Sequence, residues 1–154
     1  MKPRKKYRPG RVLLDPVGHV LTGFKPLAEI KSTTARLKIG YHGALDLLRR
    51  GKASREEILC LGDTINMAEA MVHVTGLGVE YLPEIHAAEM ALQALGNRDK
   101  FIALGVELTA LNRLAEIHDA QFKVVTVAEA EKALAYIEER VRRAARPAVA
   151  GTVS

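Results

Sequence analysis

The stretch that decides the fold is SREEILCLGDTINMAEAMVHVTGLG, residues 54–78. It opens with Ser54-Arg55-Glu56-Glu57, a capping box in which the serine and the second glutamate satisfy free N–H groups at the start of a helix. Apolar residues then recur at spacings of three and four, and they are Ile58, Leu61, Ile65, Ala68 and Val72. Gly76 and Gly78 supply a loop. The stretch therefore predicts one amphipathic helix that ends near Thr75.

Four further stretches, on both sides of this one, show helical spacing. They cover residues 32–50, 83–96, 99–122 and 127–145, and a second capping box, Thr126-Val127-Ala128-Glu129, opens the last. The longest is expected to be the central helix, with one side made of Ile102, Val106, Ala110, Leu114, Ile117 and Gln121. Asp15 and Pro16 suit the start of a short helix over residues 16–21. We therefore predict an all-α antiparallel bundle of about five helices plus this short N-terminal helix.

Composition sets the size and the class of the domain. The chain has 154 residues, of which 48% are hydrophobic, enough for one core and too few for a second domain. It has no Trp and only 5% aromatic residues, so the core is expected to consist of Leu, Ala, Ile, Val and Met. We predict a basic extended N-terminal arm over residues 1–14, a single helical domain over 15–147 and a flexible tail over 148–154. The single cysteine, Cys60, excludes an internal disulfide and is expected to pack as a small apolar residue.

Positive charge gathers at the two ends of the chain. Residues 1–11, MKPRKKYRPGR, contain six basic residues and no acidic one, and residues 140–146 contain four arginines and no acidic residue. The rest of the chain has 13 basic and 18 acidic residues, so it carries a net charge of −5 although the whole chain carries +5. A third basic cluster, RRGKASR at residues 49–55, lies at a predicted helix end, where the helix dipole favours cations.

The basic ends suit a contact with a polyanion, because each Lys or Arg that reaches a phosphate releases about one counterion. The predicted nucleic-acid-binding residues are Lys2, Arg4, Lys5, Lys6, Tyr7, Arg8, Arg11, Arg140, Arg142, Arg143 and Arg146. Tyr7 could stack on a base, and the flanking prolines suit an extended chain. Two other interpretations of the arm stay open. It could dock on an acidic protein surface, or it could serve only as a solubilising tail.

The sequence offers no convincing catalytic or metal-binding motif. The His and carboxylate pairs at helical spacing, such as Glu69 and His73, lack the Glu-x-x-His order of carboxylate-bridged metal bundles. The glycines of TGLGVEY fail the G-x-G-x-x-G pattern, since Tyr81 stands at the last required position. Residues 111–137 outline a helix-turn-helix, but Glu129 and Glu131 would face phosphates. We therefore expect a protein that is not an enzyme and that uses no cofactor and no metal.

Three short segments carry a resemblance to a group of known proteins. With KPRKKYRP at residues 2–9, TALNRL at 109–114 and HDAQ at 118–121, the chain resembles small uncharacterised helical proteins encoded by bacteriophages and prophages of proteobacteria. The resemblance implies a mobile-element protein that works inside a bacterial cell, and it assigns no catalytic residue.

These observations together predict a non-enzymatic accessory protein that contacts nucleic acid or a nucleoprotein complex through its arm and its arginine-rich last helix. The alternative is an adaptor or inhibitor that binds a host or phage protein, such as a host defence complex, through an apolar helix face. No apolar run approaches the length of about 20 residues that spans a membrane, and no secretory signal is recognised. A location in the bacterial cytoplasm is therefore expected, and homo-oligomerisation stays open.

Overall fold

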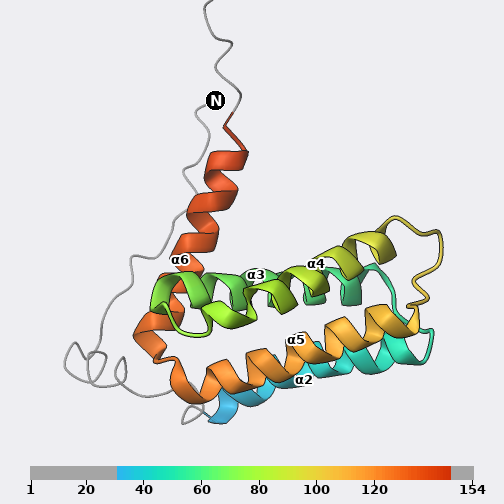
Figure 1. Cartoon of the computed structure of the whole chain (residues 1–154), viewed down its shortest axis with the longest axis horizontal. Coiled ribbons are helices and arrows are strands. Elements are labelled where there is room, and N and C mark those ends of the chain that lie inside the picture. Colours follow the sequence, from blue (N-terminus) through green and yellow to red (C-terminus); the bar gives the residue numbers. More distant parts are fainter. Residues whose placement is uncertain (1–30, 147–154) are drawn as a thin grey trace, which may run out of the picture.

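The computed structural model describes the backbone of residues 31–146 and the side chains of residues 35–146. Its elements are α2 (Lys31–Arg49), α3 (Arg55–Thr75), the short 3-10 helix η2 (Val79–Tyr81), α4 (Leu82–Gly96), α5 (Gly105–Val124) and α6 (Val127–Ala144). The residues described include no β-strand, which confirms the predicted all-α class (Figure 1). The predicted arm over residues 1–14, the short helix over 16–21 and the tail over 148–154 lie outside the described residues.

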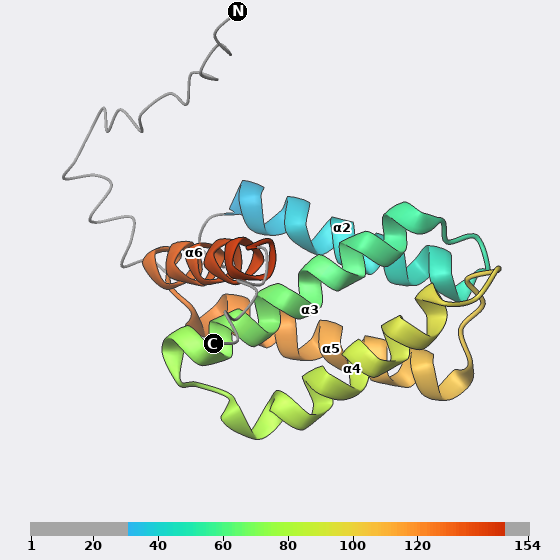
Figure 2. The same cartoon turned by 90° about the horizontal axis from the view of Figure 1, so that it is seen from above.

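Helices α2 to α5 form a four-helix bundle in which neighbours in sequence run antiparallel (Figure 1). Helix α2 packs against α3 and α5, and α4 packs against the same two helices. Helix α3 also packs against α5 and, most extensively, against α6, so it contacts every other long helix and runs through the middle of the molecule (Figure 2). The prediction that residues 99–122 form the central helix is therefore wrong, because α6 packs mainly on α3.

Helix α3 follows the sequence pattern closely. The backbone N–H of Ser54 donates to Glu57 Oε2 at 2.6 Å, and Ser54 Oγ accepts from the backbone N–H of Glu56 at 3.3 Å. The helix ends at Gly76, whose φ of 70° lies in the left-handed region that favours glycine. Its predicted apolar side is buried at Leu61, Ile65, Ala68 and Val72. Both predicted ends and the buried side of this helix are thus confirmed.

The start of α5 differs from its prediction, because residues 99–104 are not helical. Arg98 donates two hydrogen bonds to Glu107, from Nη1 to Oε1 at 2.6 Å and from Nη2 to Oε2 at 2.8 Å. The same carboxylate accepts from the backbone N–H of Leu104 at 2.8 Å, so it caps the helix there, and the bond to Arg98 lowers its pKa. Helix α5 therefore begins at Gly105.

This late start moves the buried side of α5. Ile102 and Val106, which the sequence places on the apolar side, are exposed, Val106 at 79%. The residues that are buried instead are Glu107, Leu111, Leu114, Ala115, Ile117, His118 and Phe122. The predicted apolar side is thus correct in its second half, at Leu114 and Ile117, and wrong in its first half.

Candidate nucleic-acid interface

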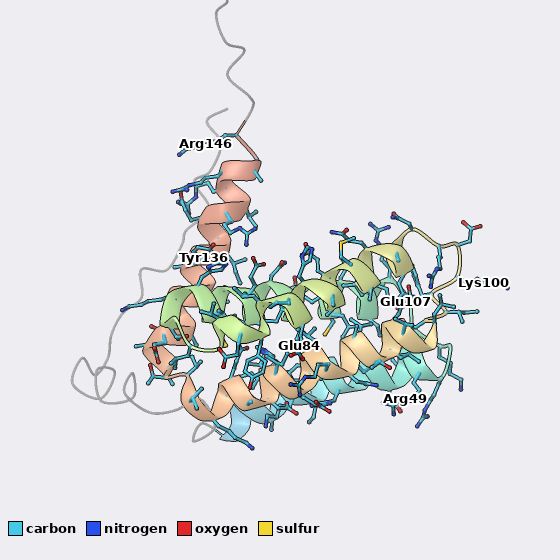
Figure 3. All side chains as sticks on the ribbon, in the orientation of Figure 1. Arg49, Glu84, Lys100, Glu107, Tyr136 and Arg146 are labelled. Atoms are coloured by element: carbon cyan, nitrogen blue, oxygen red, sulfur yellow. The ribbon has the colours of Figure 1, made fainter. Side chains whose placement is uncertain are left out.

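The end of α6 carries the four arginines that the sequence predicts to bind phosphate. Arg140, Arg142 and Arg143 lie within the helix, and Arg146 lies just beyond it. All of residues 141–146 are exposed. Figure 3 shows Arg146 at the tip of this segment, well away from the bundle that holds Glu84 and Glu107. The structure therefore brings these four predicted residues together on one projecting segment.

The first half of α6 holds this segment in place. Thr126 Oγ1 accepts from the backbone N–H of Glu129 at 3.2 Å, and Glu129 Oε1 accepts in return from the backbone N–H of Thr126 at 3.0 Å. Ala130 and Ala133 are buried, and the Tyr136 ring stacks on the His73 ring of α3 with centroids 5.6 Å apart. No side chain from residue 138 to residue 146 is buried. The arginines thus sit on the exposed last part of a helix that is anchored to the bundle at its start.

Three of the four arginines form exposed ion pairs with a glutamate. Arg142 Nη1 lies 3.1 Å from Glu139 Oε2, and Arg143 Nε lies 3.2 Å from Glu139 Oε1. Arg140 Nη1 lies 3.5 Å from Glu69 Oε2 of α3, and its guanidinium lies 5.7 Å from the centre of the Tyr136 ring. Exposed pairs of this kind contribute about 0–1 kcal/mol and weaken in salt. A phosphate could therefore replace these carboxylates at little cost, especially since arginine has five donors.

The remaining predicted binding residues are not placed by the structure. Lys2, Arg4, Lys5, Lys6, Tyr7, Arg8 and Arg11 lie outside the described residues. The arm therefore enters the interface only as a prediction.

The third basic cluster, at residues 49–55, lies at the end of the bundle away from the tip of α6 (Figure 1). There Arg50 Nε lies 3.0 Å from Asp46 Oδ2, and Arg49 Nη2 donates to Asn112 Oδ1 at 3.5 Å. Gly51, with φ of 68°, ends α2 beside them. These contacts are typical of basic residues at a helix C-terminus, as the sequence predicts.

The sequence missed a polar cluster that joins α2 to α5. The Tyr41 hydroxyl donates a short hydrogen bond to Asp119, and His42 Nε2 lies 3.0 Å from Asp119 Oδ2. Burial raises the pKa of the Tyr41 hydroxyl, and the bond to Asp119 raises it further. Burial also tends to raise the pKa of Asp119, but hydrogen bonds from Tyr41 and His42 outweigh it and lower this pKa. No spacing reveals such a contact, since Tyr41 and Asp119 are 78 residues apart.

A buried histidine lies next to this cluster. The His118 ring lies 5.3 Å from the Tyr41 ring and 4.8 Å from the Phe122 ring, measured between centroids. Burial lowers the pKa of His118, although its hydrogen bond to Gln121 acts in the opposite direction. Burial thus favours the neutral form of the imidazole. Glu116 and Asp119 flank His118 in the sequence, but within residues 35–146 no three His, Cys, Asp or Glu side chains converge on a metal position.

Comparisons with known proteins add no assignment to this geometry. No protein-family model, curated protein or solved structure matches the chain. None of the helices between residues 31 and 146 has both the length and the apolar character that crossing a membrane requires.

Proposed function

We propose that this chain is a non-enzymatic accessory protein of a phage or another mobile element that contacts nucleic acid, alone or in a nucleoprotein complex. The contact is made by the basic N-terminal arm and by the arginine-rich end of α6. The mobile-element part of this proposal rests on the resemblance at residues 2–9 and 109–121. The nucleic-acid part rests on the distribution of charge.

One observation carries the proposal. The C-terminal part of α6 projects from the bundle and exposes Arg140, Arg142, Arg143 and Arg146 (Figure 3). Their carboxylate partners, Glu139 and Glu69, are themselves accessible to solvent, so these ion pairs can be exchanged for phosphate. Contacts of this kind with the phosphate backbone are independent of sequence and depend strongly on salt.

Fluorescence anisotropy with labelled duplex DNA, single-stranded DNA and RNA of mixed sequence tests the proposal. We expect binding at about 50 mM salt that weakens steeply as salt rises. Replacing Arg140, Arg142, Arg143 and Arg146 with Gln should reduce the slope of log K against log salt by about 0.9 per lost contact with duplex DNA. Deleting residues 2–11 should reduce it as well, because six cations are lost.

The basic cluster at the other end of the bundle provides a matched control. Replacing Arg49, Arg50, Lys52 and Arg55 with Gln removes the same four charges from a different surface. This variant should keep most of the affinity and the original salt slope. An equal loss in both variants would show that net charge alone drives binding, and no binding to any of the three nucleic acids at about 50 mM salt would contradict the proposal.

A second function is favoured by the apolar residues of the same helix. Leu134 and Val141 lie seven residues apart on one side of α6 with the half-buried Ile137 between them, and Val141 is 63% exposed. On this view the chain is an adaptor or inhibitor that binds a host or phage protein. A pull-down from nuclease-treated host lysate should then recover one stoichiometric protein, and Val141→Glu should abolish its recovery. Recovery of no protein would count against this function.

A further inference from the structure

A cavity of about 460 Å³ lies between α2, α3, α5 and α6. Its walls are mainly apolar and include Leu37, Met67, Met71, Phe122, Val127 and Leu134. The volume falls within the range of about 300–1,000 Å³ that is typical of small-molecule sites. Two methionines allow the walls to adapt to the shape of a guest, and their sulfur atoms make favourable contacts with aromatic rings. Size and lining therefore suit an apolar small molecule.

One wall of the cavity is the ring of His118, whose protonation is fixed by its neighbours. The side-chain amide nitrogen of Gln121 donates to the carbonyl of Ala68 at 2.9 Å, so the amide oxygen faces His118. That oxygen lies 2.8 Å from His118 Nδ1 and can only accept. Nδ1 therefore carries the proton, and Nε2 presents a lone pair.

This lone pair has no partner among the described residues. Among residues 35–146, the His118 side chain forms a hydrogen bond with Gln121 and with no other residue. In this part of the chain, every fully enclosed side-chain nitrogen or oxygen atom has a hydrogen-bond partner. Nε2 is therefore not fully enclosed, although His118 as a whole is only 4% exposed. Because His118 lines the cavity, we infer that the cavity is the side from which Nε2 can be reached.

We propose that this cavity binds an uncharged, largely apolar molecule that donates one hydrogen bond to His118 Nε2, and that the class that fits is an aromatic alcohol. The hydroxyl of Tyr41, which also lines the cavity, is already committed to Asp119 and offers no proton to an anion. The charged residues of the lining are Arg36, Asp63 and Glu131, which together disfavour a negative ligand. The rings of Tyr41, Phe122 and His118 favour an aromatic guest.

Two probes with the same ring system test this assignment on the full chain. 2-Naphthol donates a hydrogen bond, whereas 2-methoxynaphthalene does not. Isothermal titration calorimetry should show that 2-naphthol binds about 3–10-fold more tightly, as one hydrogen bond to a neutral acceptor predicts. On addition of 2-naphthol, the ¹⁵N resonance of Nε2 should shift, and the resonance of Nδ1 should change much less.

Variants separate the hydrogen bond from the cavity. His118→Phe keeps a ring and removes the acceptor, so both probes should bind equally. Leu134→Trp fills the cavity from its edge and should weaken both probes at least about tenfold. Leu59→Trp is the matched control, because Leu59 is also an exposed leucine and lies outside the lining of this cavity.

Three outcomes would overturn the proposal. The first is that neither probe binds the full chain at about 1 mM. The second is that Leu134→Trp and Leu59→Trp affect binding equally. The third is that the Nε2 resonance of the unmodified protein does not move when 2-naphthol binds. This last measurement decides the role of His118 even where His118→Phe fails to fold.

Discussion

Helices α3 and α6 begin in the same way and end very differently. Each opens with a capping box, Ser54 with Glu57 and Thr126 with Glu129. Helix α3 then buries one side, including Leu61, Ile65 and Val72, against four other helices, whereas α6 buries Ala130 and Ala133 and projects from the bundle (Figure 1). The comparison shows that the capping residues set the position at which a helix begins. The packing of its side chains then sets whether the helix belongs to the core or exposes its residues to a partner.

The largest effect is expected from deleting equivalent side chains in the two helices. Leu61→Ala in α3 should lower the free energy of unfolding by about 2–5 kcal/mol, because Leu61 is fully buried and its loss leaves a cavity. Leu134→Ala in α6 should cost no more than about 1 kcal/mol, because Leu134 is 48% exposed. Urea denaturation followed by circular dichroism measures both. Equal losses would show that α6 belongs to the core as fully as α3 does.

The next effect concerns the contact between the two helices. Ala133 is completely buried, so Ala133→Leu should overpack the contact of α6 with the bundle and cost about 1–3 kcal/mol. Hydrogen exchange should show that the amides of α6 lose most of their protection, while those of α2 to α5 lose less. Ala135→Leu, at an exposed position of the same helix, is the control and should leave exchange nearly unchanged. Uniform loss of protection after Ala133→Leu would contradict the view of α6 as the more separable helix.

A smaller effect is expected from the two caps. Ser54→Ala and Thr126→Ala should each cost about 1 kcal/mol, since each hydroxyl accepts from a backbone N–H at the start of its helix. The loss should appear in the global free energy of unfolding for Ser54→Ala. For Thr126→Ala it should appear mainly as faster amide exchange in α6. The opposite result would be that Thr126→Ala lowers the global free energy of unfolding, while Ser54→Ala mainly speeds amide exchange in α3. That result would show that α6 and not α3 limits global stability.

Local patterns in the sequence predicted most of the helices. The capping boxes located the starts of α3 and α6, and Gly76 located the end of α3. Residues 124–127 are all β-branched, yet the capping box at Thr126 predicts a helix start there, and α6 does begin at Val127. These features are local because they depend on residues within one or two turns of each other.

The features that the sequence did not predict depend on distant contacts. The carboxylate of Glu107 is held by Arg98, nine residues away, and this pairing moved the start of α5 to Gly105. Along α6, Leu134, Ile137 and Val141 have the spacing of a core stripe, yet only the tertiary arrangement shows that Val141 lies beyond the bundle. The cavity beside His118 needs four helices at once, so no spacing along one of them could reveal it.

The smallest effect on stability should accompany a gain in binding. Glu139→Gln removes the carboxylate that pairs with Arg142 and Arg143, and because this pairing is exposed, the change in unfolding free energy should stay below about 0.5 kcal/mol. Both arginines are then free for phosphate, so affinity for duplex DNA should rise and the salt slope should steepen. Glu89→Gln, which removes an exposed carboxylate of α4, controls for the change in net charge. Equal gains in both variants would show that general attraction, and not the free end of α6, sets the affinity.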